Sequence, residues 1–242
     1  MQGYNQYCPI ARGAEIFAER WTPLIIRNLF LGCHTFNAIA EGVPRMSRTL
    51  LTSRLKELNR LGVVEMRPNP DGRGHVYLLT SAGQELKDVT MALGAWGQRW
   101  IEMGAANYDP GIVLWAICRL AKPQMLPRRR AVVRFDLLDR KKSPFWVIFQ
   151  RPEAEVCLKP PGLDEDLVVT TTSEWLTKWH AGVVSWPDAI AQGLISIDGP
   201  ADLSRAFPRW APVSGFATIR PIQPVDLREL QTSQDAHPLG VR

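Results

Sequence analysis

The chain has few of the residues from which catalytic and metal sites are built. It contains four histidines and four cysteines in 242 residues, and neither set shows a spacing such as H-E-x-x-H or C-x-x-C. The sequence also lacks the G-x-S-x-G elbow of hydrolases and the glycine-rich loops that bind nucleotide phosphates. We therefore expect no catalytic residue, no metal and no cofactor, and we predict that the protein is not an enzyme.

Long apolar runs are also missing. No segment approaches the ~20 apolar residues of a membrane-spanning helix, and no N-terminal apolar stretch resembles a secretory signal. The cysteines are scattered along the chain, which is typical of proteins from a reducing compartment. These absences predict a soluble cytoplasmic protein without a membrane partner, associated with the nucleoid if it binds DNA.

The length and composition favour two domains. A chain of 242 residues with 45% hydrophobic content can build two cores. The predicted linker spans residues 105–111, which are small and polar and end in proline and glycine. We predict a DNA-binding and dimerisation domain over residues 1–104, a second domain over 108–220 and a flexible tail over 221–242.

The segment from Thr35 to Thr80 has the element order of a winged helix-turn-helix. It predicts a short helix, a turn at residues 42–44, a second helix opened by Ser47, and a two-stranded hairpin around a loop at residues 70–74. Proteins with this order place the second helix in the major groove of DNA. The first functional prediction is therefore binding to double-stranded DNA.

The second helix has one apolar and one polar side. At about 100° per residue its leucines fall on one side, whereas hydroxyl groups near its start and cations further on fall on the other. That order suits first turns that approach base edges and later turns that run beside phosphates. Arg54 falls among the leucines, so we assign it to a structural ion pair. The predicted DNA contacts, on this helix and on the hairpin, are Ser47, Arg48, Thr49, Thr52, Ser53, Lys56, Arg60, Arg73 and His75.

The net positive charge of the helix-turn-helix segment is consistent with DNA binding but does not by itself require it. Between Arg45 and His75 there are seven lysines or arginines against three acids. A cationic surface of this kind attracts DNA phosphates. The alternative is that a solvated helix and hairpin carry such charge without binding anything.

The helix after Thr80 carries a seam of apolar residues at alternating steps of three and four. Such a seam is typical of a helix that packs against a partner helix. One interpretation is a homodimer interface, which would set the spacing of two recognition helices on a palindromic site. The alternative is packing against the C-terminal half of the same chain. The residues of the seam are Leu86, Val89, Leu93, Trp96 and Trp100.

Residues 7–104 contain a dense and ordered series of short motifs. They are Tyr7-Cys8-Pro9-Ile10, Glu19-Arg20-Trp21-Thr22, Phe36-Asn37, Leu50-Leu51, Arg54-Leu55-Lys56-Glu57-Leu58, Gly62-Val63-Val64 and Leu79-Thr80-Ser81-Ala82-Gly83. This series resembles the HxlR-type family of bacterial winged-helix transcription regulators. The resemblance implies a dimeric DNA-binding regulator whose terminal helices build the interface. Arg48 departs from the family, because a proline is common at its position, and its cation is available for a phosphate or guanine contact.

The same resemblance draws attention to Cys8. In some members of the family a cysteine at this position senses electrophiles or oxidants. A thiol at a helix start, with Arg12 one turn on, is favourably placed for ionisation. The alternative is a small side chain that simply packs.

The C-terminal half predicts an α+β domain with a largely antiparallel sheet covered by helices. An apolar helix ends before Pro123, and further helices begin at Ser173, Pro187 and Ala201. The simplest topology for the strands between them is an antiparallel meander. The strand-like runs are residues 131–135, 145–149, 154–158, 167–171 and 194–197.

The C-terminal half contains, in order, Asp166 to Thr170, a tryptophan-bearing helix, residues 189–199 and Phe207-Pro208-Arg209-Trp210. With this order, residues 108–215 resemble the sterol-carrier-protein type (SCP2-like) fold. This resemblance implies an apolar tunnel for lipid-like or other small hydrophobic ligands. Indole rings suit such a pocket, although they also suit a plain core. Six of the nine tryptophans lie in this half, namely Trp115, Trp146, Trp175, Trp179, Trp186 and Trp210.

Two functions follow from these patterns. The first is a transcription regulator that binds a palindromic operator as a homodimer and responds to a hydrophobic ligand in its C-terminal domain. The second is a lipid-binding or carrier module whose N-terminal half serves dimerisation or nonspecific attachment to nucleic acid.

Overall fold

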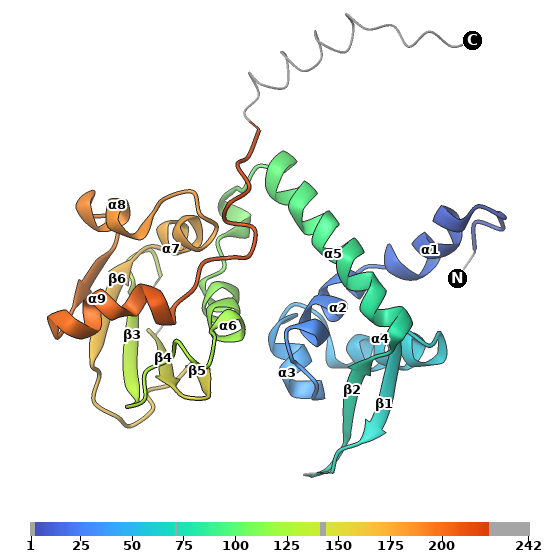
Figure 1. The fold of residues 1–242 in the computed structure, drawn as a ribbon, viewed down its shortest axis with the longest axis horizontal. Helices are drawn as coiled ribbons and strands as arrows, with labels where there is room; N and C mark the ends of the chain where they lie inside the picture. The colour runs from blue at the N-terminus through green and yellow to red at the C-terminus, as the bar shows by residue number, and fades with distance from the viewer. Residues whose placement is uncertain (1–2, 71, 141–143, 223–242) are drawn as a thin grey trace, which may run out of the picture.

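The computed structural model describes residues 3–70, 72–140 and 144–222, so most of the tail predicted over 221–242 lies outside the described residues. Two bodies lie side by side, with helix α6 between them (Figure 1). The N-terminal body contains α1 (Pro9–Phe17), α2 (Thr22–Phe30), α3 (Phe36–Glu41), α4 (Arg48–Arg60), β1 (Val64–Pro68), β2 (His75–Leu79) and α5 (Ser81–Trp100). The C-terminal body follows a 3₁₀ turn (Ala105–Asn107) and contains α6 (Pro110–Leu120), β3 (Ala131–Leu137), β4 (Phe145–Gln150), β5 (Glu153–Cys157), β6 (Leu167–Thr171), α7 (Ser173–His180), α8 (Trp186–Ala191), β7 (Ser196–Asp198) and α9 (Ala201–Trp210).

Local signals in the sequence set the ends of the helices in the N-terminal body. The Ser47 hydroxyl accepts a hydrogen bond from the Leu50 amide at 3.2 Å and so caps α4. Gly62, just after α4, has a φ of 72°, a conformation that glycine adopts without strain. The predicted cap and the predicted helix end are both confirmed.

The helix-turn-helix core is built from the apolar side of α4. Leu51, Leu55 and Leu58 are buried against α2 and the hairpin. At the edge of this core, Arg54 Nη2 lies 2.7 Å from Glu19 Oε2 and both side chains are partly buried. The predicted structural ion pair of Arg54 is therefore confirmed.

The wing is an antiparallel hairpin that leads directly into α5. Val64 pairs with Leu79 and Pro68 pairs with His75. The Thr80 hydroxyl caps α5 by accepting from the Gly83 amide at 3.1 Å. A Cβ at Gly83 would lie 2.1 Å from the Val63 carbonyl oxygen, so the glycine allows α5 to begin in close contact with the hairpin. The direction of α5 is thereby fixed relative to the wing.

The sheet of the C-terminal body has the strand order β5-β4-β3-β6-β7. The expected meander is wrong at one place, because β6 runs parallel to β3. The loop at residues 158–166 carries the chain across a face of the sheet, where Glu165 accepts from Trp146 Nε1 of β4 at 2.9 Å and pairs with Arg134 of β3 at 3.3 Å. Because this loop crosses β4 and β3, β6 lies beside β3 on the side away from β4. The other strand pairs are antiparallel.

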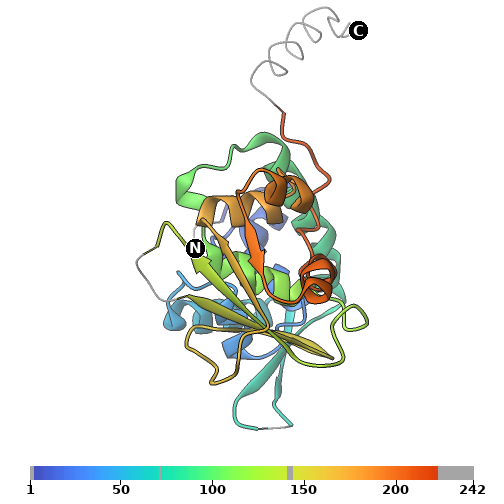
Figure 2. The same ribbon diagram turned by 90° about the vertical axis from the view of Figure 1, so that its left-hand side faces the viewer.

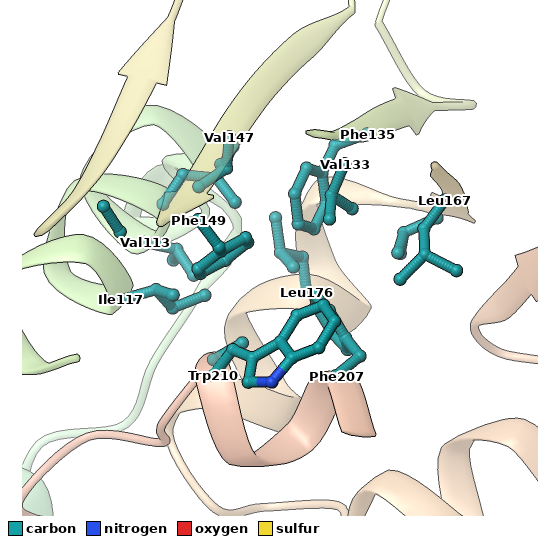
Figure 3. Close-up of a cluster of buried hydrophobic side chains, with 14 of the residues drawn as sticks. Val113, Ile117, Val133, Phe135, Val147, Phe149, Leu167, Leu176, Phe207 and Trp210 are labelled. Carbon is teal, nitrogen blue, oxygen red and sulfur yellow. The ribbon is translucent and has the colours of Figure 1, made fainter. Parts of the chain in front are cut away.

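Helices cover one face of this sheet and enclose the second core. Phe207 of α9 lies at its centre, with ring centroids 6.2 Å from both Phe135 and Phe149. Figure 2 views this body from the front, with the wing hairpin of the other body projecting below it. Figure 3 shows the core side chains Val113, Ile117, Val133, Phe135, Val147, Phe149, Leu167, Leu176, Phe207 and Trp210 converging between sheet and helices.

Helix α6 belongs to both cores. Leu114 and Ile117 are buried in the C-terminal core, whereas Trp115 is buried in the N-terminal core. An apolar residue on nearly every face is typical of a helix buried between two bodies. Among the helices of the described ranges, none combines the length and apolar character needed to cross a membrane.

Candidate nucleic-acid interface

The outward face of α4 lines a shallow groove beside the start of α3. The groove encloses about 710 Å³ and is open to solvent. Its floor is apolar at Phe36, and its sides carry hydroxyl and cationic groups. The lining residues are Phe36, Arg48, Thr49, Thr52, Ser53 and Lys56.

Neighbouring residues hold Arg48 in place at the start of α4. Its guanidinium carbon lies 4.7 Å from the centre of the Phe36 ring, and its Nη2 donates to Asn37 Oδ1 at 2.7 Å. A stacked arginine loses little further entropy when it binds an acceptor, because its side chain is already ordered. Arg48 therefore presents its remaining donors from a fixed position.

The hydroxyls of α4 are exposed but not all free of partners. Ser47 is engaged as the helix cap, and the Thr52 hydroxyl donates to the Arg48 carbonyl at 2.9 Å. Thr49 and Ser53 are exposed on the same side of the helix. A hydroxyl that donates to its own helix retains acceptor capacity for the amino group of a base.

Two cations lie further along α4. Lys56 is exposed and makes no ion pair within the described part of the chain. Arg60 pairs with Glu57 at 2.8 Å, and the arginine side chain is 69% exposed. An exposed pair of this kind contributes little stability, so a phosphate can replace the carboxylate at small cost.

The wing supplies the remaining predicted contacts. Arg73 is exposed in the hairpin loop, and His75 is exposed at the first position of β2. Asp71 lies outside the described residues. Of the nine predicted DNA contacts, the groove brings together Arg48, Thr49, Thr52, Ser53 and Lys56.

One residue of this surface was missed by sequence reasoning. Phe36 packs against the N-terminal core as a partly buried side chain. It also lines the groove and stacks under Arg48. An aromatic residue next to a helix cap, with an arginine at the start of the following helix, is the signal that would have suggested this pairing.

Apolar side chains are exposed along α5 and α1. Val89, Leu93, Trp96 and Trp100 are between 39% and 55% exposed, whereas Leu86 packs against the N-terminal core. In α1 no residue is buried. Exposed apolar residues that line up along a helix are typical of interaction surfaces.

The opposite side of α5 meets the C-terminal half of the same chain. A Cβ at Gly94 would lie 2.4 Å from the ring of Phe216, and the Ile222 amide donates to the Arg99 carbonyl at 2.8 Å. Packing within the chain, the alternative that the sequence left open, therefore occurs on this side. It leaves the seam from Val89 to Trp100 exposed.

The six tryptophans do not gather around one cavity. Trp179, Trp186 and Phe207 contact one another with ring centroids 4.8 to 6.1 Å apart. Trp210 packs on Phe149 at 6.1 Å. The others are dispersed: Trp115 lies in the N-terminal core, Trp146 donates to Glu165 and Trp175 lies under Lys178.

Cys8 lies at the N-cap of α1 and is partly exposed, but its side chain makes no capping hydrogen bond. Cys33 and Cys118 are buried. Burial raises the pKa of Cys118 to about 12. Among the described residues, no three His, Cys, Asp or Glu side chains gather closely enough to hold a metal ion.

Comparisons with known proteins match the part of the chain that contains this surface. The family model of the HxlR-like helix-turn-helix matches residues 16–105. The HTH-type transcriptional regulator MT3179 of Mycobacterium tuberculosis is 37% identical over 95 residues, which are 38% of this chain and 58% of that protein. The chain thus spans somewhat more than half the length of this relative.

A second relative is covered almost completely. The HTH-type transcriptional regulator YodB of Bacillus subtilis is 35% identical over 102 residues, which are 41% of this chain and 91% of YodB. The solved structure of reduced YodB from B. subtilis is 34% identical, with a TM-score of 0.36, over 41% of this chain and 99% of that one. On the family-model match and the sequence match with YodB, the chain belongs to the HxlR-like helix-turn-helix family.

Proposed function

We propose that this protein is a transcription regulator that binds double-stranded DNA through the outward face of α4. The observation that carries the proposal is the exposed groove in which Arg48, Thr49, Thr52, Ser53 and Lys56 lie together. Hydroxyl groups in the first turns suit contacts with base edges, and cations suit phosphates. The wing, with Arg73 and His75 exposed, extends the same surface toward the neighbouring backbone.

The protein acts as a homodimer on a palindromic operator. The exposed seam of α5 and the unburied helix α1 supply a self-complementary apolar interface. Because α5 begins hard against the wing, an α5 interface fixes the distance between two copies of α4. That distance sets the spacing of the two half-sites.

Footprinting tests the proposal against its alternative, a lipid-binding or carrier module that attaches to nucleic acid without sequence preference. The probe is the DNA upstream of the protein's own gene, compared with a random duplex of equal length. A regulator protects a short palindromic stretch at moderate salt. Diffuse protection that disappears as salt rises would instead favour the carrier module.

Two forms of regulation extend this proposal. A hydrophobic ligand in the C-terminal body would act by favouring one dimer geometry over another. Cys8 is a thiol sensor because it stands at the N-cap position of α1, a helix without buried residues that modification can displace at low cost. Alkylation of Cys8 should therefore change DNA affinity, and a Cys8→Ser protein treated with the same reagent should show no change.

A further inference from the structure

The C-terminal body is docked directly on the turn of the helix-turn-helix. The Trp115 ring of α6 lies under the Arg27 guanidinium at 4.9 Å, and its edge approaches Gly42 so closely that a Cβ there would be 2.5 Å away. Arg27 donates to the Gly42 carbonyl at 2.6 Å. Gly42 ends α3 and begins the turn into α4, so α6 supports the turn that orients the recognition helix.

A cleft opens beside this contact, between the two bodies. It encloses about 1030 Å³, at the upper end of the roughly 300–1,000 Å³ of small-molecule pockets. The N-terminal body contributes Pro44 of the turn, and the C-terminal body contributes the side of α6 that carries Ile112, Trp115 and Arg119 together with β5 and Phe145. A molecule in this cleft would touch both bodies at once.

Two buried donors on that side of α6 have no acceptor within the described part of the chain. They are Trp115 Nε1 and Arg119 Nε. Trp115 is only 7% exposed, so water does not easily satisfy its indole N–H. Residues four apart lie on the same side of a helix, roughly 5–6 Å apart. Trp115 and Arg119 therefore share the side of α6 that lines the cleft.

The rim of the cleft has the opposite character. Glu41, Glu153 and Glu155 line it and are exposed, and Asp109 and Arg140 also line the cleft. The carboxylates outnumber the Arg140 cation and repel a second negative charge near the opening. Ile112 and Phe145 add apolar surface, and the Arg140 guanidinium carbon lies 5.7 Å from the centre of the Phe145 ring. The cleft therefore suits a molecule with one acidic head and an uncharged apolar body.

We propose that the cleft between the two bodies binds an aromatic monocarboxylate, whose carboxylate accepts from Trp115 Nε1 and Arg119 Nε and whose ring lies against Ile112 and Phe145. The proposal rests on the proposed function in one respect, namely that occupancy alters DNA binding. The ligand contacts Pro44 beside the turn and Trp115 beneath it. It thereby favours one orientation of α4 over another.

The binding part is tested by calorimetry on the full-length protein, with 2-naphthoate as the probe. Arg119→Met should weaken binding by about tenfold or more, since a charge-assisted hydrogen bond is lost. Trp115→Phe keeps the ring packed and should weaken binding by about two- to tenfold. As a control, Arg205→Met replaces an exposed arginine of α9 outside the cleft. This variant should bind 2-naphthoate with the affinity of the unmodified protein. The melting temperature of each variant verifies its folding.

Ligand chemistry gives a second, independent readout. The neutral 2-naphthalenemethanol lacks the acidic head, and naphthalene-2,6-dicarboxylate brings a second charge to the acidic rim; both should bind more weakly than 2-naphthoate. No binding of 2-naphthoate overturns the site, and so does binding that is insensitive to both Arg119→Met and Trp115→Phe.

The coupling is tested by repeating the footprint titration with saturating 2-naphthoate. Operator affinity should change by about fivefold or more in the unmodified protein and remain unchanged in Arg119→Met. An operator footprint without binding of 2-naphthoate would refute this inference and leave the proposed function intact. Binding of 2-naphthoate in the cleft without any operator footprint would support the binding site and refute the proposed function. Binding of 2-naphthoate that leaves operator affinity unchanged would refute the coupling between the two.

Discussion

Replacing Gly42 with alanine tests whether the C-terminal body supports the helix-turn-helix. The backbone at Gly42 has ordinary helical angles (φ −80°, ψ −3°), so alanine causes no backbone strain there. Its Cβ, however, would lie 2.5 Å from both Trp115 Cζ2 and Asn28 Nδ2. Carbon atoms in contact normally lie about 3.5–4.0 Å apart. The substitution therefore forces apart the two bodies, or α3 and α2, or both.

The expected cost follows from overpacking. Inserting a methyl into a packed interface costs about 1–3 kcal/mol, which for a protein of this size lowers the melting temperature by about 3–10 °C. Differential scanning calorimetry measures this shift. The matched control is Gly13→Ala, at an exposed position of α1 where a Cβ would meet nothing within 4 Å; it should gain up to about 1 kcal/mol.

A double-mutant cycle assigns the cost to Trp115. Phenylalanine at position 115 is shorter than the indole, so Gly42→Ala should cost less in a Trp115→Phe background than alone. Equal costs in both backgrounds would place the clash entirely on Asn28. A Gly42→Ala protein that melts at or above the temperature of the unmodified protein would refute the docked arrangement.

Three further predictions follow from the structure. Trp96→Glu introduces a charge into the exposed seam of α5 and should shift the protein from dimer to monomer by analytical ultracentrifugation, whereas an unchanged dimer would exclude this face as the interface. Burial lowers the pKa of His180 from 6.5 to about 4, so the folded state should lose about 3 kcal/mol as pH falls through that window; the loss should be absent in His180→Gln, and equal pH profiles in urea unfolding would contradict it. Because burial raises the pKa of Cys118 to about 12, iodoacetamide at pH 8 should modify Cys8 but not Cys118 in the native protein, and mass spectrometry of Cys118 peptides carrying the label would refute its burial.

Most of the N-terminal body could be predicted because its signals are local. Ser47 and Thr80 are caps, and Gly62 ends α4, as the residue types at those positions indicate. The ion pair of Arg54 with Glu19 was predictable in kind, because a cation on the apolar side of a helix needs a partner.

The C-terminal body was less predictable because strand order is not a local property. The runs that form β3 and β6 were recognisable, but nothing within them indicates that they pair in parallel. Trp115 illustrates a second limit: nothing in its local sequence indicated that its ring packs into the N-terminal core. A helix that is apolar on nearly every side was the available signal that α6 lies between two bodies.

The central claim, that α4 reads DNA, is tested most directly by comparing Ser53→Ala and Lys56→Ala on the footprinted operator and on a random duplex over a range of salt concentrations. Loss of a phosphate contact should weaken Lys56→Ala on both duplexes and lower the salt slope by about one per contact. Ser53→Ala should weaken operator binding and leave random DNA unchanged. Equal losses on both duplexes for Ser53→Ala, or full affinity in both variants, would contradict the account.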